Sequence, residues 1–253
     1  MAAPRATWVW DRPHPRDLVS WVRGRGVTEL FVAVRAGPQS PAELAWLRSV
    51  VERAHAHGMS VAALGGDKGW VDDTAPALAW LRAVSAMRLF DGVHLDVEVW
   101  DHDEWEERPG ELGSAFVELL RQLREATPLR LEADIAFHLH TVSTSPGESL
   151  ESAVMRVVDA VTVLSYRNTV SGPDSITDVA RSAVTAASRR GVPCRLAVET
   201  KDLGPDPVAR KQTFHGLGQD ALDRALTEVD RRLADVAAYR GVAVHDVEHW
   251  RRL

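Results

Sequence analysis

Hydrophobic residues along the chain fall into two alternating patterns. Short runs rich in apolar and β-branched residues recur between longer segments in which apolar residues return every three or four positions, as at Leu44, Leu47, Val51 and Ala54. The short runs predict eight strands, at residues 7–10, 29–34, 60–64, 92–97, 129–135, 160–165, 195–198 and 242–245. The longer segments have the spacing of one helix face, so strand and helix are expected to alternate throughout.

The predicted strands are mostly continuous apolar runs, which is typical of a parallel sheet covered on both faces. Eight strand–helix units in 253 residues match the size of a closed barrel, and no Pro-, Gly- or Ser-rich linker marks a domain boundary. We therefore predict an α/β protein with a single (β/α)8 TIM barrel over residues 1–253. A doubly wound open sheet is the alternative, but residues 10–15, after the first strand, lack the Gly-rich phosphate-binding fingerprint.

Composition excludes several classes of partner. The chain has 30 basic and 36 acidic side chains, a formal charge of −6, which disfavours nucleic acid. No apolar stretch approaches the roughly 20 residues of a membrane helix, and the first residues lack an apolar core of signal-peptide length, so no membrane partner and a cytoplasmic location are expected. The single cysteine, Cys194, excludes an internal disulfide.

Motifs for cofactors and metals are missing from the sequence. It has no P-loop, no CxxC pair and no nucleophile elbow, so no cofactor is expected. His102, His138 and His140 do not have the spacing of a known ligand set, and we predict no metal site. The expected partner is a small, carbohydrate-like molecule, and the sequence does not indicate an oligomeric state.

The predicted fourth strand contains the most informative polar residues. In a (β/α)8 barrel the active site lies at the carboxyl ends of the strands. His94, Asp96 and Glu98 alternate along this strand, so they share one face at levels about 6 to 7 Å apart, with Glu98 nearest the mouth. Burial of neighbouring carboxyl groups raises the pKa of one of them, and a carboxyl group that is protonated near neutral pH can act as a general acid.

Polar and aromatic residues at the other strand ends form the expected substrate-binding surface. Flat aromatic side chains can stack on a sugar ring, and cationic side chains indicate an anionic group on the ligand. The candidates are Trp10, Arg35, Lys68, Trp70, Trp100, Asp134, Arg167, Lys201, His245 and Trp250.

Residues 90–98, Phe-Asp-Gly-Val-His-Leu-Asp-Val-Glu, resemble the strand-4 signature of family-18 glycoside hydrolases, the chitinase-like barrels. The resemblance implies that Glu98 donates a proton to the leaving glycosidic oxygen. It also implies that Asp96 orients a substrate N-acetyl group that acts as an internal nucleophile. Residues 164–167, Leu-Ser-Tyr-Arg, are similar to the family's Met-x-Tyr-Asp element, which implies a role for Tyr166. By the same resemblance, Trp250 would be the tryptophan under the sugar.

Two positions differ from the family pattern. His94 stands where the first acid of the strand-4 series is expected, and Arg167 replaces an aspartate. Another mechanism is also open, because Glu98 and Glu199, at the ends of predicted strands four and seven, resemble the acid/base and nucleophile pair of retaining barrel glycosidases. A carboxyl separation of about 5 to 5.5 Å would favour that covalent route, and about 6.5 to 9.5 Å would favour inversion.

The sequence therefore predicts a glycoside-hydrolase-like enzyme that cleaves or rearranges a glycosidic bond in a small soluble substrate. The predicted catalytic residues are Glu98, Asp96, Glu199 and Tyr166. Two other functions are compatible with the same residues, since one fold hosts many reactions. They are acid-catalysed, non-glycosidic chemistry in a biosynthetic pathway, and carbohydrate binding without catalysis.

Overall fold

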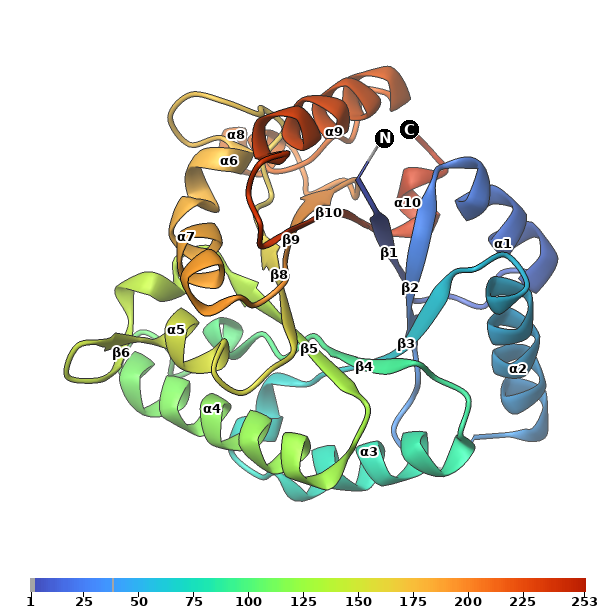
Figure 1. Ribbon diagram of the computed structural model, residues 1–253, viewed down its shortest axis with the longest axis horizontal. Coiled ribbons are helices and arrows are strands. Elements are labelled where there is room, and N and C mark those ends of the chain that lie inside the picture. The colour runs from blue at the N-terminus through green and yellow to red at the C-terminus, as the bar shows by residue number, and fades with distance from the viewer. Residues whose placement is uncertain (1–2, 38) are drawn as a thin grey trace.

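Parallel strands form the centre of the molecule and close into a ring (Figure 1). The computed structural model describes residues 3–37 and 39–253, and within them the ring has eight strands in the order β1-β10-β9-β8-β5-β4-β3-β2. Their bounds are β1 (Arg5–Val9), β2 (Val27–Ala33), β3 (Ser60–Gly65), β4 (Gly92–Leu95), β5 (Arg130–Ala136), β8 (Ala160–Leu164), β9 (Cys194–Glu199) and β10 (Tyr239–His245). β1 pairs with both β2 and β10, so the predicted (β/α)8 barrel is confirmed.

Helices surround the ring and connect its strands (Figure 1). They are α1 (Pro15–Gly24), α2 (Pro41–His55), α3 (Ala75–Met87), α4 (Pro109–Ala126), α5 (Leu150–Val154), α6 (Ile176–Val179), α7 (Arg181–Arg190), α8 (Pro207–Lys211), α9 (Gln219–Leu233) and α10 (Val247–Trp250). The predicted helical spacing is confirmed in α2, which buries Leu47, Val51 and Ala54. Ser40 starts that helix with a capping box to Glu43, which satisfies free amide groups of the first turn.

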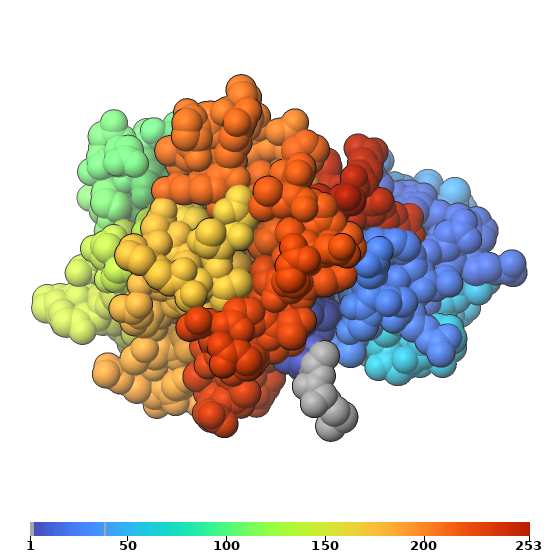
Figure 2. Space-filling view, turned by 90° about the horizontal axis from the view of Figure 1, so that it is seen from above, coloured from blue at the N-terminus to red at the C-terminus, as the bar shows by residue number. Residues whose placement is uncertain are grey.

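The two ends of the chain meet where the barrel closes. Figure 2 shows red segments from the end of the chain directly beside blue segments from its beginning. The contact includes the pairing of β1 with β10, and α10 also packs against β1. Residues far apart in the sequence are thereby brought to one part of the barrel mouth.

Apolar side chains form two layers, one on each side of the strand ring. The larger layer lies between strands and helices, and the smaller one fills the barrel interior. Inside, Trp8 and Phe31 pack edge to face with ring centroids 5.2 Å apart. Their bulk is matched by small residues on neighbouring strands, such as Ala62 and Ala243, so the interior is filled and does not form a pore.

A buried ion network closes the barrel near the amino ends of the strands. Arg195 on β9 contacts Glu29 on β2 and Glu132 on β5, each at 2.5 Å. Arg130 reaches the same two carboxylates at 3.0 and 3.1 Å. Buried charges are tolerated only when they are paired in this way. We call these four residues the floor network.

Some elements differ from the predicted ones. β4 ends at Leu95, two residues before the predicted end at residue 97, because the Val99 amide bonds to the Val97 carbonyl and turns the chain into the short helix η2 (Val99–Asp101). Two further short helices, η1 (Lys68–Val71) and η3 (Leu139–Thr141), and a hairpin of β6 (Ser143–Ser145) and β7 (Glu148–Ser149) lie outside the ring. Among the described residues, no helix has the length and apolar character needed to cross a membrane.

Candidate active site

His94 on β4 lies in the barrel interior and connects the floor network to the mouth. Its Nε2 is 3.0 Å from Oδ2 of Asp134, and its Nδ1 is 3.7 Å from Oε1 of Glu132. The ring stacks on Phe31 with centroids 3.6 Å apart. Burial lowers the pKa of His94 to about 4, despite the opposing charges of Glu132 and Asp96. The imidazole is therefore neutral near pH 7 and can donate only one hydrogen bond.

Buried Asp134 and half-buried Asp96 form a pair of carboxyl groups near His94. Burial and the negative charge of Asp134 together raise the pKa of Asp96 to about 7. Burial and the charge of Glu132 also raise the pKa of Asp134 well above its usual value. Two carboxyl groups can hydrogen-bond to each other only when one is protonated, and such a bond to Asp134 contributes to the raised pKa of Asp96.

Glu98 lies half-buried at the start of η2, beyond the end of β4. Burial raises its pKa to about 8, and the charges of Asp96 and Asp101 act in the same direction. A hydrogen bond to Asp101 also favours the protonated form. We call Glu98, Asp96 and Asp134 the acid cluster, and their raised pKa values favour protonation near neutral pH.

The loop after β3 packs closely against the acid cluster. A Cβ atom on Gly66 would lie 1.9 Å from the backbone oxygen of Asp96. Any side chain at position 66 would therefore displace the backbone of Asp96. Glycine at this position lets the loop approach closely enough to hold the turn between β4 and Glu98.

His245 lies on the opposite wall, because β10 is four strands from β4 in either direction around the ring. Its Nδ1 is 2.9 Å from Oε2 of Glu199. Oε1 of Glu199 accepts hydrogen bonds from the amides of Thr200 and Lys201 at 2.6 and 2.7 Å. These contacts hold Glu199 in a fixed orientation, directed at the imidazole.

Trp10 forms a hydrogen bond with the other nitrogen of the His245 imidazole. Its Nε1 donates to Nε2 of His245 at 2.9 Å. Because an indole N–H can only donate, Nε2 is the acceptor and Nδ1 carries the ring proton. Burial lowers the pKa of His245, but the hydrogen bond and charge of Glu199 outweigh this effect and leave the pKa raised.

Tyr166 follows β8 and completes this wall. Its ring centroid is 6.2 Å from that of His245, and the ring packs on the apolar barrel interior together with Trp100. Burial raises the pKa of the Tyr166 hydroxyl, and the negative charges of Glu199 and Asp134 raise it further. Tyr166 therefore remains a neutral hydrogen-bond donor.

The structure does not bring two of the predicted aromatic residues to the mouth. Trp250 lies in α10, is only 1% exposed and packs edge to face against Trp21 in the outer apolar layer. Trp70 lies in η1 and packs against Trp80, with centroids 5.6 Å apart. Both side chains contribute to the core between strands and helices.

The predicted cationic residues lie on loops at this end of the barrel, and three of them have acidic partners. Arg167 pairs with Asp174 at 2.7 Å, Lys68 with Asp103 at 2.6 Å, and Arg35 with Glu43 at 3.5 Å. Lys201 is exposed, and its backbone amide holds Glu199. Their charges are thus largely balanced by neighbouring acids.

Two parts of this system, Asp101 and Arg195, are absent from the residues predicted for the site. Asp101 lies in the acidic segment after Glu98 and contributes to the raised pKa of Glu98 through a hydrogen bond and its charge. Arg195 falls two residues before Ala197 and four before Glu199, so strand alternation places all three on one face. This alternation could have predicted that Arg195 faces the barrel interior.

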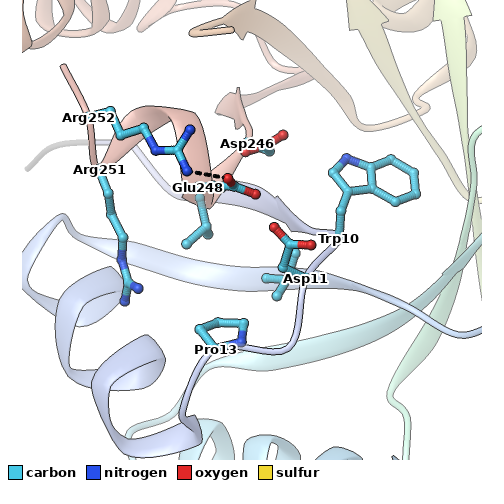
Figure 3. Close-up of a pocket in the computed structure, with 9 residues that line it drawn as sticks. Trp10, Asp11, Pro13, Asp246, Glu248, Arg251 and Arg252 are labelled. Atoms are coloured by element: carbon cyan, nitrogen blue, oxygen red, sulfur yellow. Dashed lines mark hydrogen bonds and ion pairs between the residues drawn. The ribbon is translucent and has the colours of Figure 1, made fainter.

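A cleft of about 280 Å³ lies beside Trp10, between the end of β1 and α10 (Figure 3). In Figure 3 the Trp10 ring points away from Asp11 and Glu248, and Glu248 pairs with Arg252. In the part of the chain that the structure describes, no group of three or more His, Cys, Asp or Glu side chains is arranged to hold a metal ion.

The fold and the acid cluster define a (β/α)8 barrel with carboxyl groups of raised pKa at its mouth. No protein-family model and no curated protein matches the sequence. A chitinase from Chromobacterium violaceum matches in structure with a TM-score of 0.59 and 14% identity, over 99% of this chain and 97% of the chitinase.

Two further solved structures are similar. The Bacillus cereus spore cortex-lytic enzyme SleL matches with a TM-score of 0.60 and 12% identity, over 99% of this chain and 74% of SleL. A family GH18 chitinase from Cycas revoluta, solved with allosamidin, matches with a TM-score of 0.57 and 13% identity, over 97% of this chain and 95% of the chitinase. The protein thus has a (β/α)8 barrel fold similar to that of the family-18 chitinases.

Proposed function

We propose that the protein is a glycoside hydrolase in which Glu98 is the general acid. The observation that supports this role best is the burial of Glu98 at the barrel mouth, which raises its pKa to about 8. A general acid works best when its pKa lies near the working pH, since it must both hold a proton and release it. Glu98 would protonate the leaving oxygen as the glycosidic bond breaks.

Asp96 and Asp134 support Glu98 in this proposal. When Glu98 releases its proton, the new negative charge lies beside Asp96. Because the pKa values of Asp96 and Asp134 are both raised, the pair adds less negative charge than two fully ionised carboxylates. We assign Asp96 the modulation of Glu98, and Tyr166 a hydrogen bond to the reacting centre.

Glu199 fits an electrostatic role better than that of a nucleophile. A nucleophilic carboxylate needs an oxygen free to attack the sugar. Oε1 of Glu199 accepts two backbone amides and Oε2 faces His245, so both oxygens are engaged. A fixed anion in this position stabilises positive charge on the neighbouring imidazole.

The proposed ligand is carbohydrate-like. The Cycas revoluta chitinase was also solved in complex with (GlcNAc)4, and its fold matches this one. On this chain, Trp10 is 41% exposed at the mouth, and Trp100 is half-buried and packs on the apolar barrel interior. Both present aromatic surface where a sugar ring could stack.

A second candidate is acid–base chemistry on a bond that is not glycosidic. The observation that favours it is the hydrogen-bonded pair of His245 and Glu199 facing the acid cluster, which would suit proton abstraction as well as hydrolysis. His94 and Arg167 stand where the family pattern has acidic residues, which also favours this alternative.

A panel of para-nitrophenyl glycosides, combined with calorimetry of the parent sugars, tests the proposal. We expect turnover of at least one compound, with kcat/KM falling as the pH rises through about 8, because Glu98 then loses the proton that it must donate. Sugar binding without turnover would instead identify a carbohydrate-binding barrel. Neither turnover nor binding would favour the non-glycosidic alternative.

A further inference from the structure

We propose that His245 is the general base of this site, oriented by Glu199, and that Trp10 covers its basic nitrogen until a ligand displaces the indole. The inference rests on the proposed glycosidase function and adds a second catalytic residue to it. It also assigns Glu199 as a positioning residue that acts through the imidazole.

The first support is the geometry of the His245–Glu199 pair. The amides of Thr200 and Lys201 fix one oxygen of Glu199, and the other accepts the Nδ1 proton of His245 at 2.9 Å. This arrangement fixes both the tautomer and the orientation of the ring. It also stabilises the imidazolium that forms when Nε2 takes up a proton, which is the role of the acid in a Ser-His-Asp triad.

The second support is the position of Nε2. This nitrogen keeps its lone pair and uses it to accept the Trp10 N–H at 2.9 Å. A base whose lone pair is occupied cannot take a proton from water, so the indole must move before His245 can act. Trp10 is 41% exposed, so solvent rather than protein covers much of its side chain and leaves the indole room to move.

The third support is the placement of base and acid on opposite walls. His245 ends β10, and Glu98 follows β4, half a turn around the ring. A sugar between them could receive a proton on one side and water on the other. The charged and titratable groups that face His245 are Glu199 on β9, Asp96 and Glu98 after β4, Asp134 on β5, Tyr166 after β8 and the adjacent Asp246.

The proposed reaction is the hydrolysis of a glycosidic bond. The oxygen of a water molecule forms a bond to the anomeric carbon while the bond from that carbon to the leaving oxygen breaks. One water proton passes to Nε2 of His245, and the proton of Glu98 passes to the leaving oxygen. Solvent then removes the proton from His245 and returns one to Glu98, which restores both groups.

The test compares His245→Asn, Glu199→Gln and the wild-type chain on the best para-nitrophenyl glycoside of the panel. His57→Asn serves as the control, because His57 is an exposed histidine in the turn after α2. We expect His245→Asn to lower kcat by about 10² to 10⁴-fold with little change in KM, the usual contribution of a general base. The control should keep wild-type kcat.

The pH profile separates catalysis from a structural role. On the acidic limb of the profile, activity falls as His245 takes up a proton, because an imidazole that already carries a proton on Nε2 cannot act as a base. Glu199→Gln removes the charge that raises the pKa of His245, so this limb should move to lower pH, and in His245→Asn it should vanish. An unmoved limb in Glu199→Gln, or wild-type kcat in His245→Asn, would overturn the inference while the glycosidase proposal stands. A wild-type chain that turns over no compound of the panel overturns both.

Nitrogen NMR of the labelled full chain tests whether the Trp10 indole hydrogen-bonds to Nε2 of His245. The wild-type spectrum at pH above the His245 titration should show a proton on Nδ1 and an Nε2 that accepts a hydrogen bond. Trp10→Phe removes the indole N–H, so the Nε2 resonance should shift while Nδ1 keeps its proton. A proton on Nε2 in the wild-type chain would contradict the proposed cover.

Discussion

Replacement of Glu98 with glutamine is expected to lower kcat on a turned-over glycoside by about 10² to 10⁴-fold. Glutamine keeps the shape of the side chain but has no proton to transfer to the leaving oxygen. Substrate binding should be largely retained, because the substitution removes no bulk from the mouth. Steady-state kinetics and calorimetric titration of the same sugar measure the two effects separately.

Glu107→Gln provides the matched control for this variant. Glu107 is an exposed acid in the loop before α4, outside the acid cluster. Its replacement should leave kcat at the wild-type level. If Glu98→Gln is as active as Glu107→Gln, the general acid has been assigned to the wrong residue.

Replacement of Arg195 with methionine is expected to lower the free energy of unfolding by about 3 to 5 kcal/mol, as is usual when one partner of a buried ion pair is removed. Methionine leaves Glu29 and Glu132 buried without the guanidinium that contacts both. Arg130 would still reach these carboxylates, but it is partly exposed and cannot fill the same interior position. Urea denaturation measures the change.

Arg121→Met is the control for the floor network. Arg121 makes ion pairs with Glu118 and Glu125 on the exposed face of α4. Solvent screens such pairs, so the denaturation midpoint should hardly move. Equal midpoints for Arg195→Met and Arg121→Met would show that the floor network adds little to stability.

The fold could be predicted from the sequence because strand and helix leave different spacings. The eight apolar runs all lie in or overlap strands of the barrel, and the spacing of Leu222, Leu226 and Val229 marks the buried face of α9. The ends of elements were harder to predict. Local backbone hydrogen bonds, such as that from the Val99 amide to the Val97 carbonyl, determine where β4 ends. The pattern of side chains in the sequence does not indicate these bonds.

The acid cluster was predictable in part. Alternation along one strand indicates which side chains share a face, which applies to His94 and Asp96. The partner of each group depends on contacts between distant segments, such as Asp134 with Asp96 or His245 with Glu199. Likewise, the sequence suggests cations at the mouth but does not reveal that Arg167 pairs with Asp174.

The burial of Trp250 has a similar explanation. The sequence places it five residues after His245, near the barrel mouth. The short helix α10 then turns its side chain toward Trp21 of α1, where apolar residues cover it. A single turn of helix thus decides whether this tryptophan faces a ligand or the core.

A carboxyl-carbon NMR titration of the labelled chain shows whether Glu98 holds a proton at neutral pH, as its role as general acid requires. The Glu98 resonance, assigned by its loss in Glu98→Gln, should titrate with a midpoint near pH 8, far above the value of about 4.3 for an ordinary glutamate. A midpoint near that ordinary value would mean that Glu98 is ionised at neutral pH and cannot be the proton donor.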